Sequence, residues 1–336
     1  MNKSSKISGK TPFNTIYIEE NAFDYPITRD VLKDHPCIPV VKIRCYKDVF
    51  NRKKQNFSIQ KQYPSLILAV KEDTFLYEGP KVCQSFGHAN FYYTSFLLNC
   101  IFNCEYCYLQ GMYPSANLVA FVNIHEYKTA IKNASLNAPL YLAASYDTDL
   151  IGFHKLIPYM DYFYEFFNSN TNITVEIRTK SGSQSFYKAY SPLDNIIIAF
   201  TLSPEEIIRK FEKHTPSLDI RLKAINTAIN EGYKVRLCLD PVFINPETDD
   251  LYEPFFRYIF NKINPDSVFD VGYGFFRMSN EFFKRIGKHN NSSLFAQDYC
   301  LIDDIISYPL ELQEKVKSNH IKMLSQYIKK ERIFSL

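Results

Sequence analysis

The chain has 336 residues, of which 46% are hydrophobic, and a formal net charge of +3. This length and apolar content are sufficient for one large domain or two small ones and exclude a disordered chain, and the small charge does not by itself indicate nucleic-acid binding. The polar first ten residues, together with the lack of any apolar run near eighteen residues, predict neither a secretory signal nor a membrane span, so we expect a cytoplasmic protein without membrane contact.

Residues 1–88 are expected to form a small N-terminal cap. Apolar runs at residues 15–19 and 66–71 have the composition of β-strands, and a polar stretch over residues 48–61 separates them. The polar stretch contains the basic cluster Arg52-Lys53-Lys54, which either contacts phosphates or simply faces solvent.

Strand-like and helix-like segments alternate from residue 91 onward. The strand-like segments are residues 91–98, 139–144, 173–177, 196–201, 234–239 and 267–271. The helix-like segments are residues 124–135, 154–168, 218–231 and 252–262, and Gly232 ends the third. This alternation predicts an α/β protein with parallel strands, whose functional residues gather at the carboxyl ends of the strands.

Three cysteines follow the first of these strands: Cys100, Cys104 and Cys107, with the spacing C-x3-C-x2-C. Thiolates are soft ligands for iron, and a [4Fe–4S] cluster usually needs four of them, so three would leave one iron open to a small chelating molecule. A structural zinc site or three buried thiols is the alternative, but the chain offers no second C-x2-C or His pair for zinc. With the aromatic residue Tyr108 directly after the third cysteine, this motif resembles that of the radical S-adenosylmethionine superfamily.

Further motifs make the similarity more specific. They are Cys-Glu-Tyr-Cys-Tyr-Leu-Gln at residues 104–110, Thr179-Lys180, Ile-Ile-Arg-Lys-Phe-Glu at residues 207–212 with Thr-Pro-Ser-Leu-Asp at residues 215–219, Asp-Pro-Val-Phe at residues 240–243, and Phe276-Arg277. Between about Tyr17 and Arg285 the chain resembles the spore photoproduct lyase family. The resemblance implies a partial (β/α)6 TIM-like barrel over residues 89–290, preceded by the cap and followed by a C-terminal extension over residues 291–336.

The resemblance also implies an activity. The family repairs spore photoproduct, 5-thyminyl-5,6-dihydrothymine, in the DNA of spore-forming bacteria. A reduced [4Fe–4S] cluster cleaves S-adenosylmethionine to a 5′-deoxyadenosyl radical, the bridging carbon–carbon bond of the lesion breaks, and two thymines result. We therefore expect damaged DNA as a partner, reduced flavodoxin or ferredoxin as the electron donor, and the cytoplasm of a spore or germinating cell as the location.

Site residues follow from matching positions in the family motifs. Each has an ordinary alternative: a solvated lysine, capping or strand threonines, packed tyrosine rings, or an arginine in a surface salt bridge. The resemblance implies cluster ligands Cys100, Cys104 and Cys107; S-adenosylmethionine contacts from Lys180, Thr148, Thr201 and the backbone of Asp240; a radical relay through Tyr106 and Tyr108; and a lesion contact from Arg277.

The chain departs from the family pattern at the hydrogen-donating cysteine, where it has Tyr146. Either Tyr146 donates the hydrogen atom, or a cysteine elsewhere in the chain does. We favour Cys83, which precedes the first barrel strand in a segment that contains a glycine turn, over Cys238 and Cys300.

The C-terminal part departs as well. Residues 292–308 are mostly acidic or neutral, whereas the family has a basic, aromatic hairpin near its end. Two alternatives therefore stay open: a related radical enzyme that acts on another nucleobase or small substrate, and a noncatalytic iron–sulfur or zinc module that binds nucleic acid.

Overall fold

The computed structural model describes residues 13–244 and 249–336, which form two compact units. The first unit comprises the described residues up to 72 together with residues 113–123, and the second comprises residues 73–112 and the described residues from 124 to 336. These boundaries differ from the expected ones at residues 88 and 290. Residues 73–88 and the C-terminal extension belong to the second unit, and the short segment 113–123 belongs to the first.

The first unit is built on parallel strands in the order β2-β1-β3-β8. Its strands are β1 (Ile16–Glu19), β2 (Val40–Ile43), β3 (Leu66–Ala69) and β8 (Leu118–Phe121), and its helices are α1 (Pro26–Asp34), α2 (Lys47–Phe50) and α3 (Phe57–Gln62). The two strands expected near residues 15–19 and 66–71 are therefore present. The polar stretch between them forms short helices instead of an open loop, and the Asn56 side chain caps α3 by accepting from the backbone N–H of Ile59.

The second unit is built on a curved eight-stranded sheet in the order β18-β14-β13-β11-β10-β9-β5-β4. All neighbouring pairs are parallel except β4–β5. The strands are β4 (Tyr77–Glu78), β5 (Phe91–Tyr93), β9 (Leu140–Ala143), β10 (Ile173–Thr179), β11 (Ile196–Thr201), β13 (Lys234–Val242), β14 (Val268–Phe275) and β18 (Ile333–Ser335). Six of them coincide with the predicted strand segments, which confirms the partial α/β barrel.

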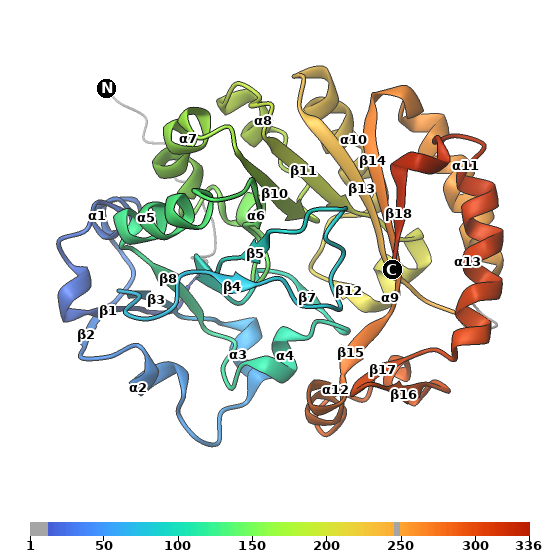
Figure 1. Cartoon of the computed structure of the whole chain (residues 1–336). Coiled ribbons are helices and arrows are strands. Elements are labelled where there is room, and N and C mark those ends of the chain that lie inside the picture. Colours follow the sequence, from blue (N-terminus) through green and yellow to red (C-terminus); the bar gives the residue numbers. More distant parts are fainter. Residues whose placement is uncertain (1–12, 245–248) are drawn as a thin grey trace, which may run out of the picture. The chain divides into compact units, whose positions relative to one another are not determined.

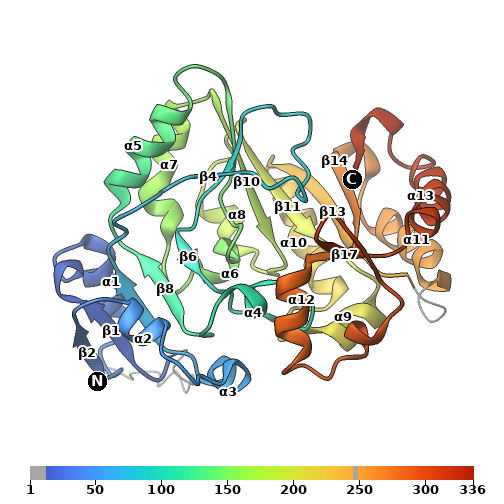
Figure 2. The same ribbon diagram turned by 60° about the horizontal axis from the view of Figure 1, so that its bottom comes forward.

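Helices alternate with these strands along the chain and follow the outer side of the curved sheet (Figures 1 and 2). The longer ones are α5 (Ile124–Ala134), α7 (Tyr159–Ser169), α10 (Leu218–Asn230), α11 (Tyr252–Lys262) and α13 (Leu310–Leu324). Apolar residues at helical spacing bury one face of each, as with Tyr252, Phe256 and Ile259 on α11. Among the described residues, no helix is long and apolar enough to cross a membrane.

A buried polar network crosses the inner face of the sheet. Arg236 on β13 pairs with Asp270 on β14 at 2.5 Å and with Glu176 on β10 at 2.7 Å, and it donates to the Tyr141 hydroxyl on β9 at 2.6 Å. The Arg178 and Arg236 charges, against the effect of burial, hold the pKa of the Glu176 carboxyl below its ordinary value. Because every charge in the network has a partner, the burial cost is offset, and side chains of β9, β10, β13 and β14 are tied together across the sheet.

The C-terminal extension adds structure that its charge pattern did not predict. Strand β18 extends the sheet beside β14. Strands β16 (Cys300–Ile302) and β17 (Ile305–Ser307) form an antiparallel hairpin, and β17 also pairs antiparallel with β15 (Arg277–Ser279). The hairpin turn is Asp303-Asp304, both with positive φ, a conformation that aspartate tolerates better than most residues. A hairpin is therefore present in this part of the chain, and its turn is acidic, in line with the charge pattern of residues 292–308.

Candidate active site

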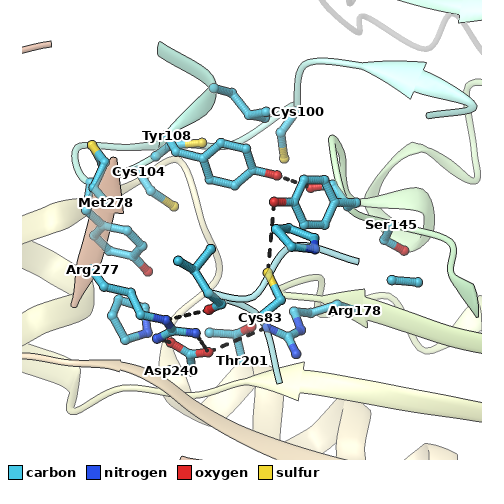
Figure 3. A pocket seen from close by; sticks show the side chains of 18 of the residues that line it. Cys83, Cys100, Cys104, Tyr108, Ser145, Arg178, Thr201, Asp240, Arg277 and Met278 are labelled. Atoms are coloured by element: carbon cyan, nitrogen blue, oxygen red, sulfur yellow. Dashed lines mark hydrogen bonds and ion pairs between the residues drawn. The ribbon is translucent and has the colours of Figure 1, made fainter. Parts of the chain in front are cut away.

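A cavity of about 440 Å³ lies at the carboxyl ends of the strands of the second unit. Its walls come from the ends of β9, β10, β11 and β13, the segment that follows β5, and residues 80–84 (Figure 3). This is the place where parallel barrels gather their functional residues. All twelve predicted site residues line this one cavity: Cys83, Cys100, Cys104, Tyr106, Cys107, Tyr108, Tyr146, Thr148, Lys180, Thr201, Asp240 and Arg277.

The three thiols come from one short segment with little regular structure. Cys104 lies in β7 (Asn103–Cys104), which pairs antiparallel with β12 (Glu212–Lys213), and Cys107 precedes α4 (Leu109–Met112). The backbone N–H of Phe102 points at the Cys100 sulfur, 3.5 Å away, and such a donor stabilises a thiolate. Burial raises the pKa of the Cys104 thiol, so a bound metal would have to displace its proton.

Within the described residues, no group of three or more His, Cys, Asp or Glu side chains is arranged to hold a single metal ion. Thiolates of an iron–sulfur cluster bind different irons and do not have to converge on one point. The donor set of three thiols around an open cavity therefore fits an iron–sulfur cluster with one iron left open.

A buried ion pair holds the cysteine segment in place. Glu212 pairs with Arg221, accepts a hydrogen bond from the Tyr106 hydroxyl, and lies opposite Cys104 in the β7–β12 ladder. Arg221 also donates to Thr215 Oγ1 at 2.7 Å and to the carbonyl oxygen of Thr201 at 3.1 Å. Both charged side chains are fully buried, and the Arg221 charge, against the effect of burial, keeps the pKa of the Glu212 carboxyl below its ordinary value. Tyr106 is thus fixed by its hydroxyl behind the cluster segment.

Lys180 lies at the end of β10, with its ammonium 5.5 Å from the centre of the Tyr106 ring. Burial acts to lower its pKa, but the neighbouring Cys104 and Glu212 charges outweigh burial and the pKa is raised. The backbone N–H of Lys180 donates to Asp149 at 2.7 Å, and Asp149 also caps α6 (Leu150–Phe153) by accepting from Gly152. Asp149 therefore positions a cation that stays charged in the cavity wall.

Two hydroxyls in the cavity wall have no hydrogen-bond partner among the described residues: Ser145 Oγ and Thr148 Oγ1. Both belong to buried residues, and buried polar groups in folded proteins are nearly always paired. Unpaired hydroxyls in the same cavity wall as Lys180 fit the polar atoms of a bound molecule, such as a carboxylate. Thr201, on β11, lines the same cavity and is itself 1% exposed.

Cys83 and Tyr146, the two predicted hydrogen donors, are in contact. The Cys83 thiol donates to the Tyr146 hydroxyl oxygen at 3.9 Å, a contact drawn as a dashed line from Cys83 in Figure 3. The Tyr108 hydroxyl donates to the carbonyl oxygen of Tyr146 at 2.6 Å, and the two rings are 5.6 Å apart. On its other side the Tyr146 ring stacks on Tyr93 at 4.0 Å. Burial raises the pKa values of both Cys83 and Tyr146, so each carries its hydrogen at neutral pH.

Apart from Cys83, the cysteines outside the cluster motif do not line the cavity. All eight cysteines fall in the described part of the chain, and of the five outside the C-x3-C-x2-C motif only Cys83 lines the cavity. Cys238 is 1% exposed and its sulfur lies near Gly272 on the next strand, while Cys300 lies in the hairpin. This arrangement favours Cys83 over both.

Arg277 is placed in the cavity wall, but its partners are in the protein. Its guanidinium donates to the two Asp240 carboxylate oxygens at 2.9 and 3.1 Å, and its Nε donates to the carbonyl of Val82 at 2.6 Å. Arg178 approaches the same Asp240 carboxylate at 3.8 Å. Asp240 thus uses its side chain to hold two arginines, and the alternative of a surface salt bridge for Arg277 does not describe a side chain that is only 19% exposed.

Several residues of this site were not singled out from the sequence. They are Ser145, Asp149 and Arg178, and also Glu212, whose motif was noted without a role. Each lies at or just after the carboxyl end of a strand, or opposite a cysteine in a ladder. Applying the strand-end rule to every polar residue after a predicted strand would have found the first three.

The fold and the cavity together define a partial α/β-barrel enzyme with a thiol-rich site at the carboxyl ends of its strands. A family model described as spore photoproduct lyase matches residues 12–290. The chain belongs to the spore photoproduct lyase family.

Named relatives agree with this assignment. Spore photoproduct lyase of Bacillus subtilis is 23% identical over 273 residues, which cover 76% of this chain and 74% of that protein. The Clostridium acetobutylicum protein of the same name is 22% identical over 263 residues, covering 75% of each chain.

Solved structures share the fold along nearly the whole chain. Spore photoproduct lyase complexed with dinucleoside spore photoproduct has a TM-score of 0.80 and 15% identity, covering 97% of this chain and 99% of that one. A mutant of spore photoproduct lyase with bound AdoMet and the same dinucleoside has a TM-score of 0.79 and 16% identity, with the same coverage. The likeness includes the C-terminal extension.

Proposed function

We propose that this protein is a DNA repair lyase that converts spore photoproduct to two thymines. The observation that carries the proposal is the cavity in which the three motif thiols, a charged lysine and a separate thiol–phenol pair meet. Membership of the spore photoproduct lyase family and the structural likeness to enzymes solved with AdoMet and the dinucleoside lesion support it.

The residues present fit a [4Fe–4S] cluster and S-adenosylmethionine. Cys100, Cys104 and Cys107 would hold the cluster, and Lys180 with the unpaired hydroxyl of Thr148 would hold the methionine carboxylate. When bound, these groups supply a 5′-deoxyadenosyl radical, and 5′-deoxyadenosine supplies the hydrogen atom that closes the cycle. The protein contributes placement, exclusion of water and a hydrogen donor.

The hydrogen donor in this proposal is Cys83. After the bridging bond of the lesion breaks, a thymine radical takes the hydrogen atom of the Cys83 thiol: the S–H bond breaks, a C–H bond forms on thymine, and a thiyl radical remains on Sγ. Its support is the contact of this thiol, from the loop between β4 and β5, with Tyr146, the residue at which the family pattern expects a cysteine.

Tyr146 acts after Cys83 and does not replace it. Its hydroxyl lies 3.9 Å from Cys83 Sγ, so its O–H hydrogen restores the thiol and leaves a phenoxyl radical on Tyr146. Tyr108 is next in line, because its ring lies 5.6 Å from the Tyr146 ring and its hydroxyl holds the Tyr146 backbone. In this proposal the two predicted donors therefore form one relay.

Replacing Cys83 by alanine tests the donor. With the reduced enzyme, dithionite and the synthetic dinucleotide lesion, we expect the ratio of thymine to thymine-sulfinate adduct to fall roughly 10–100-fold, because the thymine radical loses its positioned hydrogen source. Chromatography of the products measures the ratio. The matched control Cys300→Ala, a thiol outside the cavity, should leave the ratio unchanged.

Tyr146→Phe separates the relay from the first donation. This variant keeps the stacked ring but lacks the hydroxyl, so a single turnover should still give thymine, while later turnovers slow. A normal product ratio in Cys83→Ala together with a loss of thymine in the first turnover of Tyr146→Phe would instead make Tyr146 the donor.

A related radical enzyme with another substrate is the competing function, and the acidic turn Asp303-Asp304 of the hairpin is the observation that favours it. A negative turn is unfavourable next to DNA phosphates. The same lesion assay decides: formation of 5′-deoxyadenosine without any thymine would support the competing function.

Damaged DNA is the proposed partner, and a reduced flavodoxin or ferredoxin is the proposed electron donor, in the cytoplasm of a spore or germinating cell. Binding to DNA needs cationic groups that release counterions from phosphates. Residues 42–61 contain seven Lys or Arg and one Asp, and the side chains of Arg52, Lys53 and Lys54 are exposed. We propose that this basic segment contacts phosphates.

Changing Arg52, Lys53 and Lys54 to glutamine should reduce the slope of log affinity against log salt by about 2–3 for duplex DNA, since each lost phosphate contact removes about 0.9. Fluorescence anisotropy at several salt concentrations measures the slope. The matched control changes Lys315, Lys317 and Lys322 on α13 to glutamine and removes the same charge. An equal decrease in both variants would mean that only net charge matters.

A further inference from the structure

We propose that Arg277 and Phe86 are positioning residues that clamp the segment of residues 80–88 from both sides and so fix the Cys83 thiol over the cavity. The inference rests on the proposed role of Cys83 as hydrogen donor and extends it, because it names what holds the donor in place. It also replaces the expectation that Arg277 contacts the lesion.

The first anchor is next to Cys83 in sequence. Arg277 Nε donates to the carbonyl oxygen of Val82 at 2.6 Å, and the rest of the guanidinium is held by Asp240 and by the carbonyl of Phe275 at 2.8 Å. The planar guanidinium has five N–H donors in a fixed arrangement, so binding one partner orients it toward the others. The Asp240 carboxylate and the Phe275 carbonyl thus hold the Arg277 guanidinium. The guanidinium in turn fixes the position of Val82, and with it that of Cys83.

The second anchor lies three residues after Cys83. Phe86 has a φ of +51° and Gly87 a φ of +81°. A bulky residue is rarely found in this left-handed region and persists there only when its surroundings hold it. Here the Phe86 ring is 6% exposed, lies 3.2 Å from the guanidinium carbon of Arg236, and packs on Phe334 of β18 at 5.4 Å.

Local hydrogen bonds bend the segment on each side of Cys83. The backbone N–H of Cys83 donates to the carbonyl of Pro80 at 2.8 Å, and the Gln84 side chain accepts from the backbone N–H of Phe86 at 3.2 Å. His88 ends the segment with its ring stacked on Tyr141 at 4.5 Å. The thiol is therefore carried by a bent, internally bonded segment, although it belongs to no helix or strand.

Both anchors are connected to the charged network of the barrel. Arg236 under Phe86 is fixed by Asp270 and Glu176, and the Arg277 partner Asp240 also receives Arg178, which pairs with Glu176 at 3.2 Å. A reacting thiol must lie close to the radical it quenches, and a misplacement of about 1 Å is enough to lower a rate severely. Cys83 lies in a loop and is not held by a strand. Arg236 and Arg277 therefore supply the precise placement that its thiol needs.

The test uses full-length, reconstituted enzyme with Arg277→Lys and Phe86→Leu. Lysine keeps the positive charge but lacks the planar guanidinium that binds Val82 and Asp240 together. Leucine keeps an apolar side chain but lacks the aromatic ring on which the Arg236 guanidinium stacks. We expect two effects in each variant: the ratio of thymine to sulfinate adduct falls about 3–10-fold, and alkylation of Cys83 by iodoacetamide, followed by mass spectrometry of its peptide, becomes several-fold faster. Arg257→Lys, in an exposed ion pair on α11, is the control and should change neither.

The outcomes separate the clamp from the proposed function. If alkylation of Cys83 and the product ratio both stay at wild-type values in the two variants, the clamp is wrong. If Arg277→Lys raises the KM for the lesion with unchanged alkylation, Arg277 contacts the substrate instead. If Cys83→Ala itself leaves the product ratio unchanged, the donor role fails, whereas faster alkylation in Arg277→Lys and Phe86→Leu would still support the clamp.

Discussion

Cys104→Ser is expected to lower 5′-deoxyadenosine formation by more than about 100-fold, because even loss of an outer-shell partner of a metal site costs about 10–100-fold. Cys104 is the most enclosed of the three motif thiols, 6% exposed, and it is held in the β7–β12 ladder opposite Glu212. A serine oxygen is a harder and weaker ligand for iron than a thiolate. Iron and sulfide content, the visible absorption spectrum and the 5′-deoxyadenosine yield under dithionite measure the effect.

Two variants serve as controls for Cys104→Ser. Cys300→Ser lies outside the cavity and should keep both the iron content and the yield. Cys83→Ala should keep the iron content while changing the products, since Cys83 is assigned to hydrogen donation and not to the cluster. Full iron content and normal 5′-deoxyadenosine yield in Cys104→Ser would remove the basis of the proposed function.

Glu212→Ala should lower the free energy of unfolding by roughly 3–5 kcal/mol, because it leaves the Arg221 guanidinium buried without its carboxylate. Both side chains are fully buried, and Glu212 also accepts from the Tyr106 hydroxyl. The same change should loosen the cysteine segment, so the iron content after reconstitution should fall as well. Urea denaturation followed by circular dichroism under anaerobic conditions measures the stability.

The exposed pair Glu253–Arg257 on α11 provides the comparison for this prediction. Glu253→Ala should cost less than about 1 kcal/mol, as is usual for solvent-exposed ion pairs. Combining Glu212→Leu with Arg221→Met should recover part of the lost stability, because no unpaired charge remains. A similar small loss in Glu212→Ala and Glu253→Ala would mean that the buried pair does not hold the segment.

The alternation of strands and helices and the cluster motif were predictable from the sequence because both are local. Burial on both faces gives parallel strands apolar runs, and β9 and β11 consist almost entirely of such a run. The C-x3-C-x2-C spacing lies within eight residues, so its chemistry needs no knowledge of the fold. The boundaries of the cap were less predictable, since residues 113–123 join the first unit only because β8 completes a parallel sheet begun much earlier in the chain.

The hydrogen donor and its support were decided by tertiary structure. Cys83 and Tyr146 are 63 residues apart and Arg277 is 195 residues from Val82, yet a barrel brings its strand ends to one edge whatever their separation in sequence. No local pattern distinguishes a thiol aimed into a cavity from one packed against a strand, such as Cys238. The sequence alone thus determined the fold class and the cluster motif, whereas only the three-dimensional convergence of strand ends decided which thiol meets the site and which arginine holds it.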